Sequence, residues 1–151
     1  MIDGNALETW SSELARVLAD ALLALRNRIG HAEIRAFAID CYPWHGSIAF
    51  SVLTSEEVRD DPLLDAVEEM AAWRYYDFAS TPDGGTPGID ALGEVMRREY
   101  TSATDAGARA AVTDAFLEAC AEAAADSMVS AVLETFVRAD NFWTRVAQPD
   151  E

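Results

Sequence analysis

The sequence predicts a single α+β domain, in which a small antiparallel sheet (an N-terminal hairpin plus a C-terminal strand) packs with four or five helices. Three observations lead to this fold class. Apolar residues recur at helical spacing near the N-terminus, two short alternating runs follow, and further helical patterns fill the second half. The chain has 151 residues, the size of one common domain, and 50% of them are hydrophobic. We therefore expect one domain over residues 1–151, with polar tails at 1–5 and 148–151.

A helix followed by a β-hairpin is predicted first. Across residues 6–29, apolar side chains recur every three or four positions, and Gly30 then ends the pattern. Residues 33–41 and 46–54 have the length and the alternation of strands. Between them, residues 42–45 include a proline, which cannot donate a hydrogen bond to a sheet. We expect this segment to be the hairpin loop.

An acidic helical stretch is predicted after the second strand. Thr54 and Glu57 have the spacing of a capping box, which marks the start of a helix. A proline then suits the first turn of a further helix over residues 62–71, with Asp60 or Asp61 as its cap.

The second half of the chain is predicted to be mainly helical. A loop is expected at residues 80–88, because this segment is rich in glycine and proline, and a helix at 89–100. The helical pattern from residue 104 to 136 is unusually long for a globular domain, so a break is expected near residues 126–127. Residues 141–146 alternate in polarity and predict a closing strand.

The charge balance of the chain is strongly acidic. Asp and Glu number 27 against 11 Lys and Arg, so the formal net charge is −16 and the isoelectric point is near 4.3. Nucleic acid is not an expected partner, because its binding depends on cations that neutralise phosphates. No signal peptide or membrane-spanning stretch is visible, and the two cysteines are far apart in sequence. We expect a cytoplasmic protein with reduced thiols and no membrane partner.

Two sets of residues are candidates for catalysis. Cys41 and His45 flank the hairpin loop and could form a thiolate–imidazole pair. Such a pair needs an orienting carboxylate, and the neighbouring Asp40 is expected to point to the opposite face of the strand. Carboxylates gathered in a cleft are the second set, because they can carry acid–base chemistry. Neither set forms a recognised motif, and we predict no catalytic, metal-binding or cofactor-binding residue.

The most informative candidate is a protein-binding surface. Carboxylates are densest at residues 56–69, and the aromatic-rich residues 73–78 follow, as a short strand or an ordered irregular segment. Exposed rings rimmed by charge are typical of binding hot spots. A basic partner is favoured, because complementary charge speeds encounter. The predicted partner-binding residues are Glu56, Glu57, Asp60, Asp61, Trp73, Tyr75, Tyr76 and Trp44.

The order of these elements resembles a bacterial protein family. The residues that carry the resemblance lie at 34–39 in the first strand, at 72–76 in the aromatic segment, and at 142–146 with 149–151 near the C-terminus. On these residues the chain is similar to members of the domain of unknown function 4303 family. The resemblance implies a single small domain of the kind found at toxin–immunity loci, and it carries no catalytic residues. The loop at residues 41–45 and the Ala-rich long helix depart from the family pattern.

The sequence therefore favours a non-enzymatic cytosolic binding protein, such as an immunity-type inhibitor that docks on a basic toxin. Two alternatives stay open. One is a small enzyme that uses cleft carboxylates or the pair Cys41 and His45. The other is a structural or oligomeric subunit, for which the apolar face of the long C-terminal helix would supply the interface.

Overall fold

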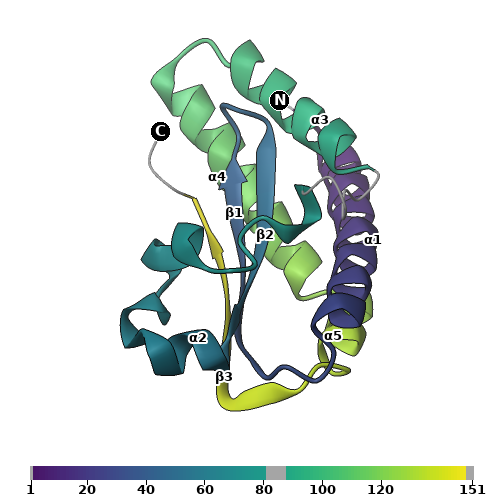
Figure 1. Ribbon diagram of the computed structural model, residues 1–151. Coiled ribbons are helices and arrows are strands. Elements are labelled where there is room, and N and C mark those ends of the chain that lie inside the picture. Colours follow the sequence, from purple (N-terminus) through teal and green to yellow (C-terminus); the bar gives the residue numbers. More distant parts are fainter. Residues whose placement is uncertain (1, 81–87, 149–151) are drawn as a thin grey trace.

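A three-stranded sheet lies between a layer of long helices and a layer of short ones in the computed structural model, which describes residues 2–80 and 88–148 (Figure 1). The predicted α+β class is confirmed. Most of the predicted loop at 80–88 and of the predicted tail at 148–151 lies outside the described residues.

Helix α1 (Gly4–Ile29) begins and ends at the residues that cap it. Asp3 accepts a hydrogen bond from the backbone N–H of Ala6 at 2.8 Å, which satisfies a donor at the helix start. At the other end Gly30 has a φ of 61°, which glycine adopts without steric cost, and its N–H bonds to the Arg26 carbonyl at 2.9 Å. The predicted helix is confirmed, and it starts earlier than expected because Asp3 caps it.

The sheet has the strand order β2-β1-β3 and is mixed. Strands β1 (Ile34–Tyr42) and β2 (Ser47–Thr54) pair antiparallel and form the predicted hairpin. The closing strand β3 (Arg138–Ala147) pairs with β1 in parallel, so the expectation of a wholly antiparallel sheet was wrong. The helices bring the chain back to the beginning of β1, where the Ile34 N–H donates to the Val137 carbonyl at 2.8 Å. Both strands therefore start at the same end of the sheet.

Four helices cover the first face of the sheet: α1, α3 (Ile89–Ser102), α4 (Ala106–Ala124) and α5 (Ser127–Leu133). Trp10 of α1 packs edge-on against Phe116 of α4, with ring centroids 4.9 Å apart. The larger of the two hydrophobic cores lies on this face.

The long C-terminal helix is broken near residues 126–127, as predicted. The Asp126 carboxylate accepts a hydrogen bond from the Met128 N–H at 2.8 Å, so that a new helix starts there. In the part of the chain that the structure describes, no helix is both long and apolar enough to cross a membrane.

The 3-10 helix η3 (Phe78–Ser80) packs on the first face, where Phe78 and Ala79 join the larger core. Short helices cover the second face of the sheet: α2 (Ser55–Asp60) and the 3-10 helices η1 (Pro62–Leu64) and η2 (Val67–Ala72). They lie on the opposite side of the strands from α1 (Figure 1). Small residues of β1 and β2 leave room for the large side chains of this layer. The resulting second core contains Ala36, Ala38, Ala49, Leu53, Met70 and Trp73.

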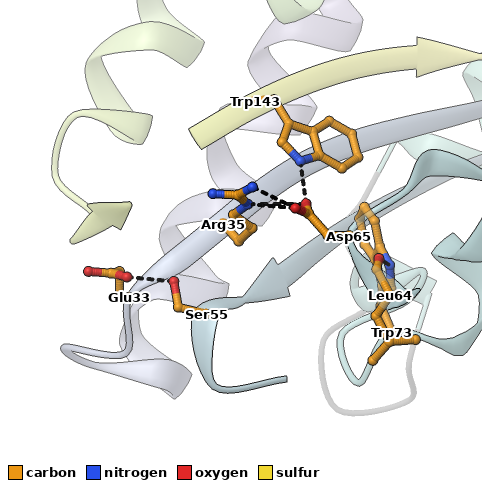
Figure 2. A network of polar contacts seen from close by, with 7 residues as sticks. All are labelled: Glu33, Arg35, Ser55, Leu64, Asp65, Trp73 and Trp143. Carbon is orange, nitrogen blue, oxygen red and sulfur yellow. Dashed lines mark hydrogen bonds and ion pairs between the residues drawn. The ribbon is translucent and has the colours of Figure 1, made fainter. Parts of the chain in front are cut away.

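The single helix predicted over residues 62–71 is wrong, because Asp65 and Ala66 interrupt it. The Asp65 carboxylate binds side chains from two different strands (Figure 2). It accepts hydrogen bonds from Arg35 Nη2 at 2.5 Å and from the indole N–H of Trp143 at 2.7 Å. The next residue, Ala66, is extended, so the helical course ends there. We call Arg35, Asp65 and Trp143 the sheet clasp.

The sheet clasp should contribute strongly to stability. The side chains of Arg35 and Asp65 are only 18% and 20% exposed. We expect Asp65→Ala to lower the free energy of unfolding by about 2–3 kcal/mol in urea denaturation at pH 7, because a guanidinium and an indole N–H lose their acceptor. The hydrogen bond from Arg35 lowers the pKa of Asp65 below its usual 3.8, so this contribution should be lost only as the pH falls below 3.8.

Asp60→Ala is the matched control, because Asp60 is an exposed carboxylate of the same layer. It should change the free energy of unfolding by no more than about 0.5 kcal/mol. Similar losses in the two variants would contradict a structural role for the clasp.

Candidate functional site

The acidic segment after β2 forms an outward-facing corner of the molecule. Its exposed carboxylates lie on α2, on the turn before η1 and on η2, and these three elements contact one another in sequence. Arg59 and Arg74 are also exposed on this segment, which therefore carries five exposed carboxylates and two exposed guanidiniums. We define the acidic corner as Glu56, Asp60, Asp61, Glu68 and Glu69 together with Leu63.

Leu63 is the apolar feature of the acidic corner. It is 79% exposed, against 44% for each of the other three exposed large hydrophobic residues in the described chain. Its backbone N–H donates to the Asp61 carboxylate at 3.2 Å, which holds η1 in place. The next residue, Leu64, packs against the second core instead. A single apolar side chain rimmed by carboxylates has the composition of a protein-binding spot.

Glu57 lies beneath the acidic corner and is only 6% exposed, so the prediction that it binds a partner was wrong. Its Oε2 accepts hydrogen bonds from the N–H and the hydroxyl of Thr54, at 2.9 and 2.7 Å, and completes the predicted capping box. Its Oε1 accepts from the Arg74 N–H at 2.6 Å. Glu57 therefore joins α2 to the chain that follows η2.

Trp73 is also buried, at 3% exposure, and cannot serve as the predicted aromatic anchor. Its indole N–H donates to the Leu64 carbonyl at 2.8 Å, and its ring packs edge-on against Trp143 with centroids 5.8 Å apart. The alanines of the sheet explain this burial, because they leave space for a large ring on the second face.

The other predicted aromatic residues do not join the acidic corner in one surface. Tyr75 and Tyr76 are half-buried, and the Tyr75 carbonyl accepts a hydrogen bond from Val52 at 3.2 Å. Trp44 belongs to the hairpin turn, where it packs against Tyr100 with ring centroids 6.3 Å apart. That turn and α2 lie at opposite ends of the eight-residue strand β2, about 25 Å apart.

A second polar site lies where the hairpin meets η3 and the start of α3. There a cleft of about 300 Å³ opens. Asp77, with a φ of 50°, is held by hydrogen bonds from its own N–H to the Ser51 hydroxyl at 2.8 Å and from the Ser80 hydroxyl to its carboxylate at 2.9 Å. Burial raises the pKa of Asp77. Among the described residues, the polar lining includes Tyr42, His45, Tyr76, Asp77, Ser80 and Asp90.

Asp40 lies on the second face of the sheet and is only 7% exposed. The Tyr42 hydroxyl donates to its Oδ2 at 3.1 Å, and Tyr42 lines the cleft together with Tyr76. Burial raises the pKa of Asp40 and also that of Tyr42. The position of Asp40 could be predicted from the sequence, because it lies on the same face of β1 as Ala36 and Ala38. The nearness of Tyr42 and Tyr76 could not be predicted, because they are far apart in the chain.

The candidate pair Cys41 and His45 is not assembled. Cys41 points into the first core, where it has no exposed surface and its Sγ lies 3.4 Å from the Met96 Sδ. His45 is exposed on the hairpin turn and its ring lies against Tyr42 and Trp44. In the described ranges 2–80 and 88–148, no three His, Cys, Asp or Glu residues are grouped so that they could hold a metal ion.

No protein-family model matches the chain, and neither a curated protein nor a solved structure matches it.

The raised pKa of Asp40 means that its charged form destabilises the fold. We expect Asp40→Asn, which keeps an acceptor for Tyr42, to raise the free energy of unfolding at neutral pH. This gain should shrink as the pH falls through the raised pKa and vanish below 3.8, the ordinary value, where the unfolded chain is also protonated. Asp114→Asn, at an exposed position of α4, should show no such trend in urea titrations between pH 3 and 8. A pH-independent difference would contradict the argument.

Proposed function

We propose that the protein is a non-enzymatic binding protein that docks on a basic partner protein through its acidic corner. The observation that carries the proposal is the placement of Leu63, which is 79% exposed on η1, between the exposed carboxylates of α2 and those of η2 along the chain. Burying a leucine side chain against a partner stabilises the complex by roughly 1.5–3 kcal/mol relative to leaving it in water.

Charge supports the same interaction. A net charge of −16 attracts cationic proteins over distances up to the Debye length, about 8 Å at physiological ionic strength, and so speeds encounter. Charge alone is not specific here, because exposed carboxylates also lie on α1 and α4. Leu63 distinguishes the acidic corner from those helices, since it adds an anchor that a merely solubilising surface lacks.

The proposal extends to an immunity-type inhibitor that acts in the cytoplasm. This role is supported by charge, because a cationic toxin would complement the carboxylates of the acidic corner. A surface of carboxylates with one apolar anchor fits a groove lined by lysine or arginine. The partner would then be a basic protein, not a nucleic acid or a membrane.

Reversing charge at the acidic corner should weaken partner binding. The triple variant Glu56→Lys, Asp60→Lys, Glu69→Lys should lower the affinity at least tenfold at low salt and flatten its salt dependence. Asp61 is left intact because it holds Leu63 in place. The measurement is capture by the immobilised protein from an extract of the cells that make it, followed by titration of the captured protein in purified form.

The matched control reverses three exposed carboxylates of α4, Asp114, Glu118 and Glu122, and so changes the net charge equally. It should retain most of the binding. The captured protein should also be basic. Equal losses in both triple variants, or capture of acidic proteins only, would count against the acidic corner.

Leu63 should be a hot spot for binding but not for folding. We expect Leu63→Ala to weaken binding of the purified partner by tenfold or more, and to leave the thermal midpoint unchanged because the side chain is 79% exposed. Leu23→Ala removes the same atoms from α1, at a position that is 44% exposed, and should leave the affinity unchanged. Calorimetric titration of the purified partner measures the affinity of each variant. If Leu63→Ala binds as tightly as the wild type, the proposed anchor is wrong.

One observation favours a second candidate, a small acid–base enzyme. Asp77 lies beside Tyr76 in the cleft, and burial raises its pKa above the ordinary value, as is common for carboxyl groups at catalytic sites. The two candidates respond differently to substitution. If the protein is an enzyme, Asp77→Asn should abolish its activity in the cell and the acidic-corner variants should keep that activity. If it is a docking protein, the acidic-corner variants should lose the activity and Asp77→Asn should keep it.

The third possibility, an oligomer formed through the long C-terminal helix, is not supported by the packing. The apolar residues of α4, including Val112, Phe116 and Cys120, are buried within the first core of the same chain. They are therefore not available to a second copy.

A further inference from the structure

The outer edge of β3 is open in the structure. β3 pairs with β1 on one side, and no other strand of the described chain lies on its far side. In an edge strand, alternate N–H and C=O groups point away from the sheet, where they pair readily with another strand. Asn141, Thr144 and Arg145 of β3 are exposed, so the described helices leave this edge accessible.

The accessible part of β3 is regular. The register with β1 shifts between Ile34 and Ala36, whose partners on β3 are Arg138 and Trp143, so β3 bulges before Trp143. From there to the end of the strand the pairing is continuous. We call residues 142–147 the β3 edge.

Side chains of the β3 edge alternate between the two faces of the sheet. Trp143 and Arg145 pair with alanines of β1 that belong to the second core. Thr144 and Val146 pair with β1 residues of the first core, and Phe142 packs against that core as well. The edge therefore presents an indole and a guanidinium on the second face, and two apolar side chains on the first.

A hollow beside the β3 edge has room for a side chain from outside. It lies between β3 and the end of α4, with a volume of about 300 Å³. Its lining includes Ala121, Ala124 and Ala125 of α4 together with Thr144 and Val146. Because the alanines are small, the hollow accommodates an apolar side chain brought in next to Val146.

We propose that two copies of the protein pair through their β3 edges, antiparallel and about a two-fold axis at Thr144. The two three-stranded sheets then join into one. The axis is perpendicular to the sheet, so each face continues across the junction, and the numbers of paired residues differ by an even amount. The inference goes beyond docking on a basic partner and does not depend on the acidic corner.

Self-complementarity selects this register. With Thr144 on the axis, Trp143 lies opposite Arg145 of the second copy. Phe142 likewise lies opposite Val146, beside the hollow, and each pair occurs twice. An indole beside a guanidinium and a phenyl ring beside a β-branched side chain are favourable cross-strand pairs. An axis at Arg145 would instead place two guanidiniums against each other, which destabilises the pairing.

Net charge opposes the pairing and makes it depend on salt. Each copy carries a net charge of −16, so two copies repel each other. The repulsion comes from the rest of the chain, because β3 itself carries two arginines and one aspartate. Screening by salt should therefore strengthen the dimer, whereas it weakens docking on a basic partner.

Sedimentation of the full chain tests the pairing, at micromolar protein concentrations and at about 0.1 M and about 1 M salt. We expect a dimer that is tighter at the higher salt concentration. Thr144→Lys places two ammonium groups against each other on the axis, and Thr144→Glu places two carboxylates there. Each variant alone should dimerise at least tenfold more weakly than the wild type. An equimolar mixture of the two variants should form a heterodimer, because opposite charges then meet.

Thr101→Lys is the matched control, since it makes the same change at an exposed position of α3 and should dimerise like the wild type. Circular dichroism checks that each variant folds. Should a Thr144 variant fail to fold, hydrogen exchange of the wild type decides the question. Exchange at residues 143–147 should then be at least tenfold slower at high protein concentration than at low.

A wild-type chain that stays monomeric at both salt concentrations would overturn the inference. So would a dimer that Thr144→Lys leaves intact, because another surface would then hold the two copies together. A dimer whose concentration-dependent protection lies outside β3 would have the same consequence.

Discussion

The carboxylate of Asp65 is the constraint on which the rest of the second layer depends. It accepts hydrogen bonds from Arg35 of β1 and Trp143 of β3, so it joins the central strand and an edge strand to the acidic segment. The segment does not continue as a helix past this residue. The side chains of the two preceding leucines point in different directions. Leu64 turns to the second core, while Leu63 stays in solvent among carboxylates. The contacts of Asp65 thus anchor the segment that carries the exposed acids.

The overall excess of charge and the acidic corner are separate features of this protein. In the described part of the chain, exposed carboxylates are spread over several helices, and a spread of this kind serves solubility whatever the function. The acidic corner differs because it combines charge with an apolar side chain on a short, well-anchored turn. The bonds of Glu57 beneath it, to Thr54 and to the chain after η2, fix that turn from inside. A rigid surface loses little entropy on binding, which favours recognition by a partner.

Sequence patterns over a few residues predicted individual helices and the hairpin. Features that depend on contacts between residues far apart in the chain could not be predicted. Periodicity and caps predicted α1, the hairpin, the capping box and the break at Asp126, because each depends on residues within a few positions. The partners of Asp65 lie 30 and 78 residues away, so no local pattern could show that it interrupts the helix expected at 62–71. The parallel course of β3 likewise depends on the path of the helices before it. For the site, carboxylate density indicated the segment on which the proposal rests. Within it, Trp73 proved to be a core residue, and Leu63, expected in a helix, is exposed on η1.

Amide hydrogen exchange tests the central role of Asp65 most directly. Several backbone N–H groups between residues 61 and 73 are hydrogen-bonded within η1, η2 and their turns, which gives the segment measurable protection. In Asp65→Ala, exchange at residues 61–73 should be at least tenfold faster than in the wild type, while α1 and β1 keep their protection. Unchanged exchange in that segment would show that the acidic corner is held by something other than the sheet clasp.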